Sequence, residues 1–337
     1  MTAAADKLEE MHFSIRYVTK YVYDAEIVDN LNALRVRPAS NSRQQVDEFS
    51  VRLTPEVRQY RHNDYFGTEV VEFEVTRPHR ELTIDVRARV TTQSQAEPTG
   101  TTWAGVQEPS YKAAGAEFLV QTDDVPGHPL LASLHATVAE EPTPLAAVVR
   151  VADLIPDRFE YRTGATYVDS PLIQLLDGEA GVCQDFSHLG LNLLRHQGIA
   201  ARYVSGYLFT AGSEGGSIGE PITVNGNGNG NGNGNGAGRP VPGDHPVAGA
   251  VESAEVDTHA WIEALLPGDG GEPFWLSIDP TNRGFAGERH VKIGHGRHYA
   301  DVPPIKGVYR GTANSELDAR VTMTRVDGPD PVAAARA

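Results

Sequence analysis

The chain has little cysteine, little positive charge and no long hydrophobic run. Only one of its 337 residues is a cysteine, so no disulfide can form within the chain, which is typical of proteins from a reducing compartment. Lysine and arginine number 29 against 45 aspartates and glutamates, a net charge of −16. Nucleic acid and anionic membranes would repel such a charge. We therefore expect no nucleic-acid and no membrane partner.

We also expect no segment that directs the protein into or across a membrane. No apolar run approaches the roughly 20 residues that span a bilayer. Residues 1–10 are acidic, lack the apolar stretch of a signal peptide and are expected to be a disordered leader. Hydrophobic residues make up 40% of the chain, enough for two buried cores at this length. The sequence thus predicts a cytoplasmic protein of two domains, and leaves its oligomeric state open.

Residues 11–95 alternate apolar and polar side chains in short runs separated by turn residues. Runs such as Val70–Val75 and Leu82–Val90 have a period of two, as in strands with one buried face. The pattern predicts an antiparallel β-sandwich, with its most turn-like stretch at Asp64–Thr68. Residues 96–125, rich in Thr, Gln, Ser, Gly and Pro, are expected to form an irregular linker.

Helical patterns followed by strand patterns predict an α+β domain over residues 126–325. One short helix is expected to begin with Ser170 as N-cap and Pro171 as its first residue. Residues 326–337 are expected to be a disordered tail. The other helical patterns cover Pro129–His135, Leu145–Leu154 and Cys183–Gln197, with Gly198 as a stop, and the strand patterns cover Ala201–Phe209, His259–Leu266 and Phe274–Ile278.

A low-complexity insert interrupts this second domain. Six consecutive Asn-Gly dipeptides occupy residues 225–236, inside a Gly- and Pro-rich stretch at 211–256. One Asn-Gly favours a hairpin turn, but six in succession offer no side chain to bury. We expect a flexible loop without a catalytic role.

The single cysteine, Cys183, lies directly after Gly181-Val182 at the start of an amphipathic helical pattern. The N-terminus of a helix favours a thiolate, which is the reactive form of cysteine. Free cysteines are more often small buried core residues. Position alone therefore leaves both interpretations open.

A thiolate nucleophile needs a proton acceptor, and the acceptor needs an orienting group. His259 begins one predicted strand, and Asp279 ends the next one after a Pro- and Gly-rich turn. An antiparallel hairpin can bring two such positions together, so that the carboxylate fixes the tautomer of the imidazole. The alternative is a surface histidine and an unrelated aspartate at the end of a strand.

Three motifs follow one another along the chain: Gly-Val-Cys183-Gln-Asp-Phe-Ser-His, Thr-His259-Ala-Trp-Ile-Glu and Trp-Leu-Ser-Ile-Asp279-Pro-Thr-Asn. In this order they resemble the motifs of the transglutaminase-like cysteine-enzyme superfamily, and the resemblance covers most of residues 11–312. Residues 11–95 are similar to the β-rich N-terminal region of its bacterial two-domain members, and the stretches 198–207 and 299–311 also resemble the family.

The resemblance implies a papain-like core with Cys183 as nucleophile, His259 as general base and then acid, and Asp279 as orienting carboxylate. It implies a peptide or protein substrate bearing an amide, and no cofactor or metal. Hydrolysis and acyl transfer both occur in the superfamily; we expect a peptidase or amidase rather than a crosslinking enzyme. A non-catalytic binding protein and a glycopeptide amidase are the alternatives. The backbone N–H of Cys183 is one expected oxyanion donor, and the second is left open.

Other candidate sites are weaker. Gly215–Gly219 matches the G-x-S-x-G pattern, but no helical pattern follows it. Asp185, in the first turn of the cysteine helix, is expected to interact with the helix dipole rather than with His188. Three histidines lie close together in the sequence, His290, His295 and His298, and we expect them to form a solvated loop rather than a metal site. His298 occupies a position that is often acidic in the bacterial members of the family.

Overall fold

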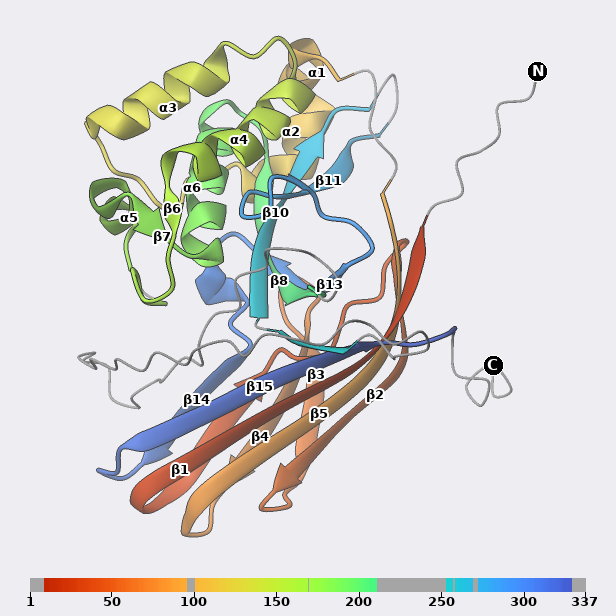
Figure 1. Ribbon diagram of the computed structural model, residues 1–337, viewed down its shortest axis with the longest axis vertical. Coiled ribbons are helices and arrows are strands. Elements are labelled where there is room, and N and C mark those ends of the chain that lie inside the picture. The colour runs from red at the N-terminus through yellow and green to blue at the C-terminus, as the bar shows by residue number, and fades with distance from the viewer. Residues whose placement is uncertain are drawn as a thin grey trace, which may run out of the picture.

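The computed structural model describes residues 9–95, 101–168, 170–210, 253–256, 258–268 and 272–328 (Figure 1). The Asn-Gly repeats and most of the predicted leader and tail lie outside these described residues. Among the helices of the described ranges, none is long and apolar enough to cross a membrane. The fold is α+β, as predicted, with helices at one end and antiparallel strands at the other.

The long strand β1 (Glu10–Leu34) organises an eight-stranded antiparallel sheet. Its first part pairs with β5 (His79–Gln93) and β15 (Ser315–Arg325). Its last part pairs with β4 (Glu69–Val75) and β14 (Ile305–Arg310), after a break in register. The remaining strands are β2 (Gln44–Thr54), β3 (Gln59–Asn63) and β9 (Ser253–Val256).

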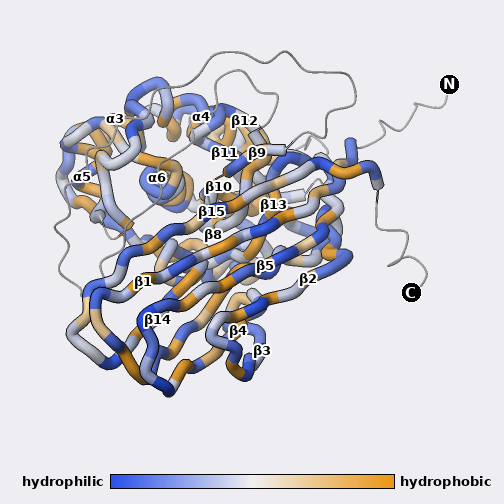
Figure 2. Tube along the Cα trace, turned by 60° about the horizontal axis from the view of Figure 1, so that its bottom comes forward, coloured by the Kyte–Doolittle hydropathy of each residue, from blue (hydrophilic) through white to orange (hydrophobic). Residues whose placement is uncertain are grey.

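The period-two pattern of the sequence produces the buried face of this sheet. Alternate residues of β5, from Leu82 through Ile84 and Val86 to Val90, are almost completely buried. Alternate residues of β1 at Phe13 and beyond pack against them in one hydrophobic core. Figure 2 shows the same alternation as hydrophobic and hydrophilic bands along these strands.

The last strands of the chain return to this sheet. Strand β15 pairs with β1 over the whole length of β15, from Ser315 opposite Tyr23 to Arg325 opposite Phe13. Strand β9 pairs with the other edge of β15. The first and the last described strands of the chain therefore lie side by side. Most of the described residues between β5 and β14 form the second part of the molecule.

That second part contains a five-stranded sheet in the order β12-β11-β10-β8-β13. Its helices cover one face, where the cluster of apolar residues includes Leu189 and Ile262. Residues such as Tyr207 and Val291 belong instead to the core of the N-terminal sheet. The strands are β8 (Ala201–Leu208), β10 (Thr258–Leu266), β11 (Phe274–Asp279), β12 (Gly284–Phe285) and β13 (His290–Gly296), and the helices are α3 (Pro129–Ala139), α4 (Pro144–Arg158), α5 (Leu172–Gly178) and α6 (Cys183–His196).

The segment predicted as an irregular linker contains short helices where it is described. These are α1 (Trp103–Gln107), α2 (Pro109–Gly115) and the 3-10 turn η1 (Ala116–Phe118). Their buried residues Tyr111 and Phe118 pack against Leu265 of β10. Helices of one or two turns are too short to produce a recognisable apolar period, which explains the difference.

Two local predictions at helix ends have different outcomes. The stop after α6 is confirmed, because Gly198 has φ of +78° and the N–H of Ile199 returns to the carbonyl of Leu194 at 3.0 Å. The cap of α5 is wrong by one residue: Pro171 is the N-cap, and the hydroxyl of Ser170 accepts the N–H of Tyr167 instead.

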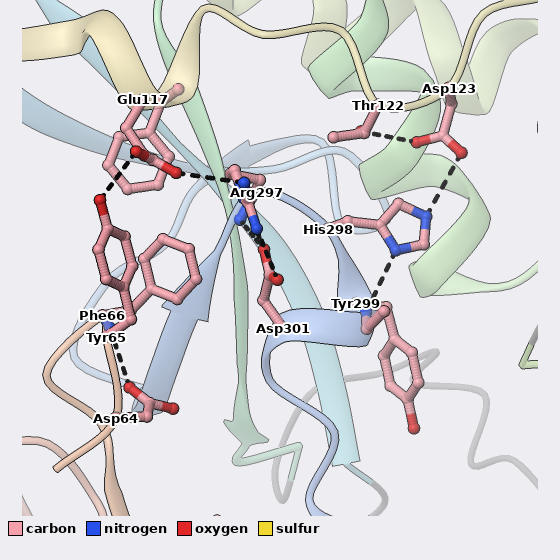
Figure 3. Close-up of polar contacts among 12 residues, drawn as sticks. Asp64, Tyr65, Phe66, Glu117, Thr122, Asp123, Arg297, His298, Tyr299 and Asp301 are labelled. Atoms are coloured by element: carbon pink, nitrogen blue, oxygen red, sulfur yellow. Dashed lines mark hydrogen bonds and ion pairs between the residues drawn. The ribbon is translucent and has the colours of Figure 1, made fainter.

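The predicted turn at Asp64–Thr68 is confirmed, and it contacts the second part of the molecule. Asp64 Oδ1 accepts the backbone N–H groups of Phe66 and Thr68, both at 3.0 Å. Figure 3 shows Tyr65 at the tip of this turn, where its hydroxyl donates to Glu117 at 3.0 Å. Glu117 in turn forms an ion pair with Arg297 at 3.3 Å. The turn therefore ties the two parts together.

Candidate active site

Cys183 is the first residue of α6, and a compact set of contacts fixes the chain just before it. The carboxylate of Asp185 accepts the backbone N–H of Val182 at 2.8 Å and the hydroxyl of Thr166. A Cβ on Gly181 would lie 2.8 Å from both Asp185 Oδ2 and a methyl group of Leu175, so only glycine fits. Cys183 thus leaves the tight turn at a defined position, half-buried.

Asp185 therefore caps the helix rather than forming a dyad with His188. Burial raises the pKa of Asp185, against the hydrogen bonds from Thr166 and Val182, which lower it. The carboxylate is held at the positive end of the helix dipole, as expected for an acidic residue in the first turn.

His259 and Asp279 are brought together by an antiparallel hairpin. Strands β10 and β11 pair with Ile262 opposite Ile278, which places the start of one strand near the end of the other. His259 Nε2 lies 2.7 Å from Asp279 Oδ2. The side chain of Asp279 is 1% exposed and that of His259 is 10% exposed, so the pair is screened from water.

The third predicted residue contacts the same histidine. Cys183 is close enough to His259 to be one of the groups that raise the pKa of its imidazole, and Nε2 of that ring faces Asp279. Burial by itself would lower the pKa of His259, but the charge and hydrogen bond of Asp279, together with Cys183, raise it well above its ordinary value. The structure thus brings all three predicted residues together, in an arrangement that favours an imidazolium beside a sulfur atom.

Asp279 is held by more donors than His259 alone. Burial would raise its pKa, but His259 and His290 hold the pKa well below the ordinary range. Its Oδ1 accepts the backbone N–H of Thr281 at 2.9 Å and that of Asn282 at 3.2 Å. Its Oδ2 accepts the side-chain amide of Asn282 at 2.7 Å and Nε2 of His290 at 3.0 Å.

Asn282 and His290 were both missed by sequence reasoning as parts of this site. Asn282 lies in the Asp-Pro-Thr-Asn segment, where a side chain can bond to a neighbour two or three residues away, and this local signal could have identified it. His290 offers no such signal, because its contact with Asp279 depends on the course of the chain between β11 and β13.

The three closely spaced histidines do not form a solvated loop, and that prediction is wrong. Most of the segment is β13, which pairs with β8 inside the core sheet. His290 contacts Asp279, His295 lies 3.2 Å from Arg202, and His298 lies 3.3 Å from Asp123. The three side chains therefore face three different partners.

Two other groups bring possible ligand atoms close together, but their geometry favours hydrogen bonding over metal binding. The rings of His188 and His298 stack with centroids 4.0 Å apart and planes 19° apart. Imidazole lone pairs lie in the ring plane, so stacked rings cannot point at one ion. Figure 3 shows His298 between Asp123 and a backbone N–H, that of Ala300. In the second group, Nε2 of His259 and Nε2 of His290 already contact the same oxygen of Asp279, Oδ2.

The fold and this site define a protein class, a β-rich N-terminal region followed by a transglutaminase-like core. Residues 13–91 match the bacterial transglutaminase-like N-terminal region, and residues 132–280 match the transglutaminase-like superfamily. An uncharacterized protein from Mycobacterium leprae is 34% identical over 312 residues, which cover 91% of this chain and 96% of the relative. The chain belongs to the transglutaminase-like superfamily, whose members are typically cysteine enzymes.

Further comparisons agree on the fold. An uncharacterized protein from Mycobacterium tuberculosis is 28% identical over 329 residues, covering 94% of this chain and 93% of the relative. A solved structure from Cytophaga hutchinsonii, named as a candidate cysteine protease, has a TM-score of 0.65 at 21% identity. It covers 95% of this chain and 92% of that chain. The predicted family and fold class are therefore confirmed.

Proposed function

We propose that this protein is a thiol hydrolase of peptide or side-chain amides. In this proposal Cys183 is the nucleophile, His259 the general base and acid, and Asp279 the orienting carboxylate. The observation that carries it is the position of one imidazole, bonded through Nε2 to Asp279 at 2.7 Å and close enough to the only cysteine of the sequence for that cysteine to affect its pKa. That is the arrangement an activated thiol needs.

The chemistry runs in two steps. The sulfur of Cys183 attacks the amide carbonyl carbon, and the proton held on His259 passes to the nitrogen of the departing amine as the C–N bond breaks. A thioester remains on Cys183. His259 then accepts a proton from water, whose oxygen attacks the thioester, and the acid leaves with the thiol restored.

The tetrahedral intermediates carry a negative oxygen that needs donors. The first N–H groups of a helix have no partner within it, and the N–H of Cys183 is one of them. We propose this group as one oxyanion donor. Removing one such donor typically costs about 10²–10³ in rate.

We propose hydrolysis rather than acyl transfer because hydrolysis demands less of the site. Water needs no pocket of its own, whereas transfer needs a site that admits an amine and excludes water. We also propose that the protein works in the cytoplasm, because an activated single thiol is preserved best in a reducing compartment.

The single cysteine allows a direct test. Alkylation of the full-length protein by iodoacetamide is followed by intact mass across pH 4–9, for the wild type and for His259→Ala. Every adduct reports on Cys183. We expect the wild type to react fast near neutral pH, and the reaction of the variant to shift to higher pH, because it lacks the imidazolium that stabilises the thiolate.

Identical pH profiles for the two proteins would contradict the proposal and favour a binding protein on the same fold. Substrate assays then separate the reactions. Glutamine-containing peptides are assayed with and without an added primary amine, and a matched glycopeptide is assayed beside them. For a hydrolase, we expect ammonia or a cleaved peptide to be released from the peptides at the same rate whether or not the amine is present. Products that contain the amine would instead identify an acyltransferase, and cleavage of the glycopeptide alone a glycopeptide amidase.

A further inference from the structure

A second histidine reaches the carboxylate of the triad from a different strand. Asp279 ends β11 and His259 belongs to β10, whereas His290 is the first residue of β13. His290 Nε2 lies 3.0 Å from the same oxygen, Oδ2, that His259 Nε2 contacts at 2.7 Å. Two imidazoles thus share one carboxylate oxygen.

The hydrogen bonds of His290 define its tautomer. Its Nδ1 accepts the backbone N–H of Gly287 at 3.2 Å, so this nitrogen carries no proton. The proton therefore lies on Nε2, which donates to Asp279. His290 is a neutral donor, in contrast to His259, which the site favours as a cation.

The surroundings keep this ring in place. It packs edge-on against Trp261 with ring centroids 5.2 Å apart, and its side chain is 10% exposed. His290 and Trp261 also line a polar cavity of about 30 Å³ between the two parts of the molecule. Of the ionisable groups around the ring, Asp279 of β11 and His259 of β10 contact it, and Glu263 of β10, Lys292 of β13 and Arg43 line the same cavity.

We infer that His290 is a positioning residue for the proposed reaction. As a neutral donor it holds the shared oxygen of Asp279 in place and helps to keep the carboxylate ionised, and it adds no charge. A cation at this place would neutralise the carboxylate and weaken its hold on the imidazolium of His259. The inference rests on the proposed function of Cys183, His259 and Asp279.

The test compares His290→Phe with His290→Gln in the full-length protein. Phenylalanine keeps the ring but removes the donor, whereas the side-chain amide of glutamine can place an N–H near the position of Nε2. Without this donor, Asp279 Oδ2 is held less firmly beside His259, so the imidazolium of His259 and the thiolate lose part of their stabilisation. We expect the pH midpoint of Cys183 alkylation to rise by about half to one pH unit in His290→Phe, and to return towards the wild-type value in His290→Gln.

His295→Phe is the matched control, because it changes a histidine of the same strand that faces Arg202 and not Asp279. Its midpoint should equal that of the wild type. If His290→Phe is folded and has the wild-type midpoint, or if His290→Gln is shifted as far as His290→Phe, the inference is wrong. If instead the wild type behaves like His259→Ala, the proposed function itself fails, and the two failures are distinct.

A measurement on the wild type covers the case in which His290→Phe does not fold. The ¹⁵N spectrum of histidine-labelled protein, assigned with His290→Gln, distinguishes the two neutral tautomers and the cation. We expect the Nε2–H tautomer for His290 at neutral pH. A proton on Nδ1 would overturn the inference, because Nδ1 could not then accept the N–H of Gly287 while a neutral ring donates through Nε2 to Asp279.

Discussion

The carboxylate of Asp279 shows how much of this site depends on one side chain. It is almost completely buried and accepts hydrogen bonds from two histidines, an asparagine side chain and two backbone N–H groups. A buried charge is tolerated only when such donors replace water. The donors also fix its orientation, so that the contact with His259 is maintained before any substrate binds.

Replacing this carboxylate should disable the site without unfolding the chain. In Asp279→Asn the amide can no longer accept the N–H of His259 in the same way, so the proton moves to the nitrogen that should face Cys183. The equivalent change in a serine-protease triad costs about 10⁴ in rate. We expect a loss of about 10³–10⁴ in kcat for amide hydrolysis, with a smaller effect on KM.

Asp123→Asn is a suitable control for that variant, since it also changes an aspartate paired with a histidine, His298. It should retain amide hydrolysis within a few-fold of the wild type. Turnover by Asp279→Asn within tenfold of the wild type would show that the carboxylate does not orient His259.

At the scale of elements, the start of α6 and the hairpin β10–β11 position the residues proposed as catalytic. The sequence indicated both from local patterns: a glycine before an amphipathic helix, and two apolar runs joined by a Pro- and Gly-rich turn. The turn before Cys183 is held by Asp185, whose carboxylate lies against Gly181. The backbone can therefore form this turn only because residue 181 has no side chain.

Gly181→Ala should disturb that turn. Its new Cβ would lie 2.8 Å from Asp185 Oδ2 and from Leu175, closer than such contacts allow. We expect a loss of about 1–3 kcal/mol in the free energy of unfolding, measured by urea denaturation, and slower alkylation of Cys183. Gly178→Ala is the matched control, because a Cβ at that position meets no described atom within 4 Å.

The control should be neutral or slightly stabilising, since alanine restricts the unfolded chain more than glycine does. If Gly181→Ala and Gly178→Ala have the same stability and the same alkylation rate as the wild type, the tight turn does not determine the position of the cysteine.

At the scale of the whole molecule, the two parts meet over a buried ionic network. Glu263 of β10 lies 2.5 Å from Arg202 of β8 and 2.5 Å from Lys292 of β13. Ser277 joins Glu263 to Arg43, which belongs to the N-terminal part of the chain. Burial lowers the pKa of Lys292 to about 8, although Glu263 opposes this shift. Glu263 is thus the carboxylate around which three cations gather.

This network predicts how stability depends on acid. Burial would raise the pKa of Glu263, but Lys292 and Arg202 hold it well below its ordinary value of 4.5. Its contribution to stability is therefore fully present above about pH 4.5 and is lost as the pH falls through the lower folded pKa. The pKa of Lys292, about 8 in the folded protein, lies well above this range, so Lys292 adds nothing to the slope.

The acid dependence is measured by urea denaturation between pH 3 and 5. For the wild type, the free energy of unfolding should fall more steeply with decreasing pH than for Glu263→Gln, by up to about 1.4 kcal/mol per pH unit. The variant should also be less stable at pH 7, by about 3–5 kcal/mol, because it leaves buried cations unpaired. Equal slopes would contradict the assignment. Glu255→Gln, which changes an exposed ion pair with Arg320, should alter stability by less than about 0.5 kcal/mol.

The sequence by itself determined those features that depend on neighbours along the chain. Period-two runs gave β5 and its buried face, the apolar period gave α6, and Gly198 gave its end. The residues Cys183, His259 and Asp279 were identified because each lies at the end of a recognisable element and in a motif of the superfamily. Short helices such as α1 and the buried strand β13 were missed, because a few residues with weak local preference carry little periodic signal.

Only the tertiary structure decided which distant residues meet. The return of β15 to β1, the approach of His290 to Asp279, and the gathering of Arg202 and Lys292 around Glu263 join residues that share no local pattern. Such contacts depend on strand order and on the course of the connections, and the free energy that selects them comes from burial and charge pairing across the whole molecule. Local sequence preference therefore placed the reactive groups, and long-range packing set their electrostatic surroundings.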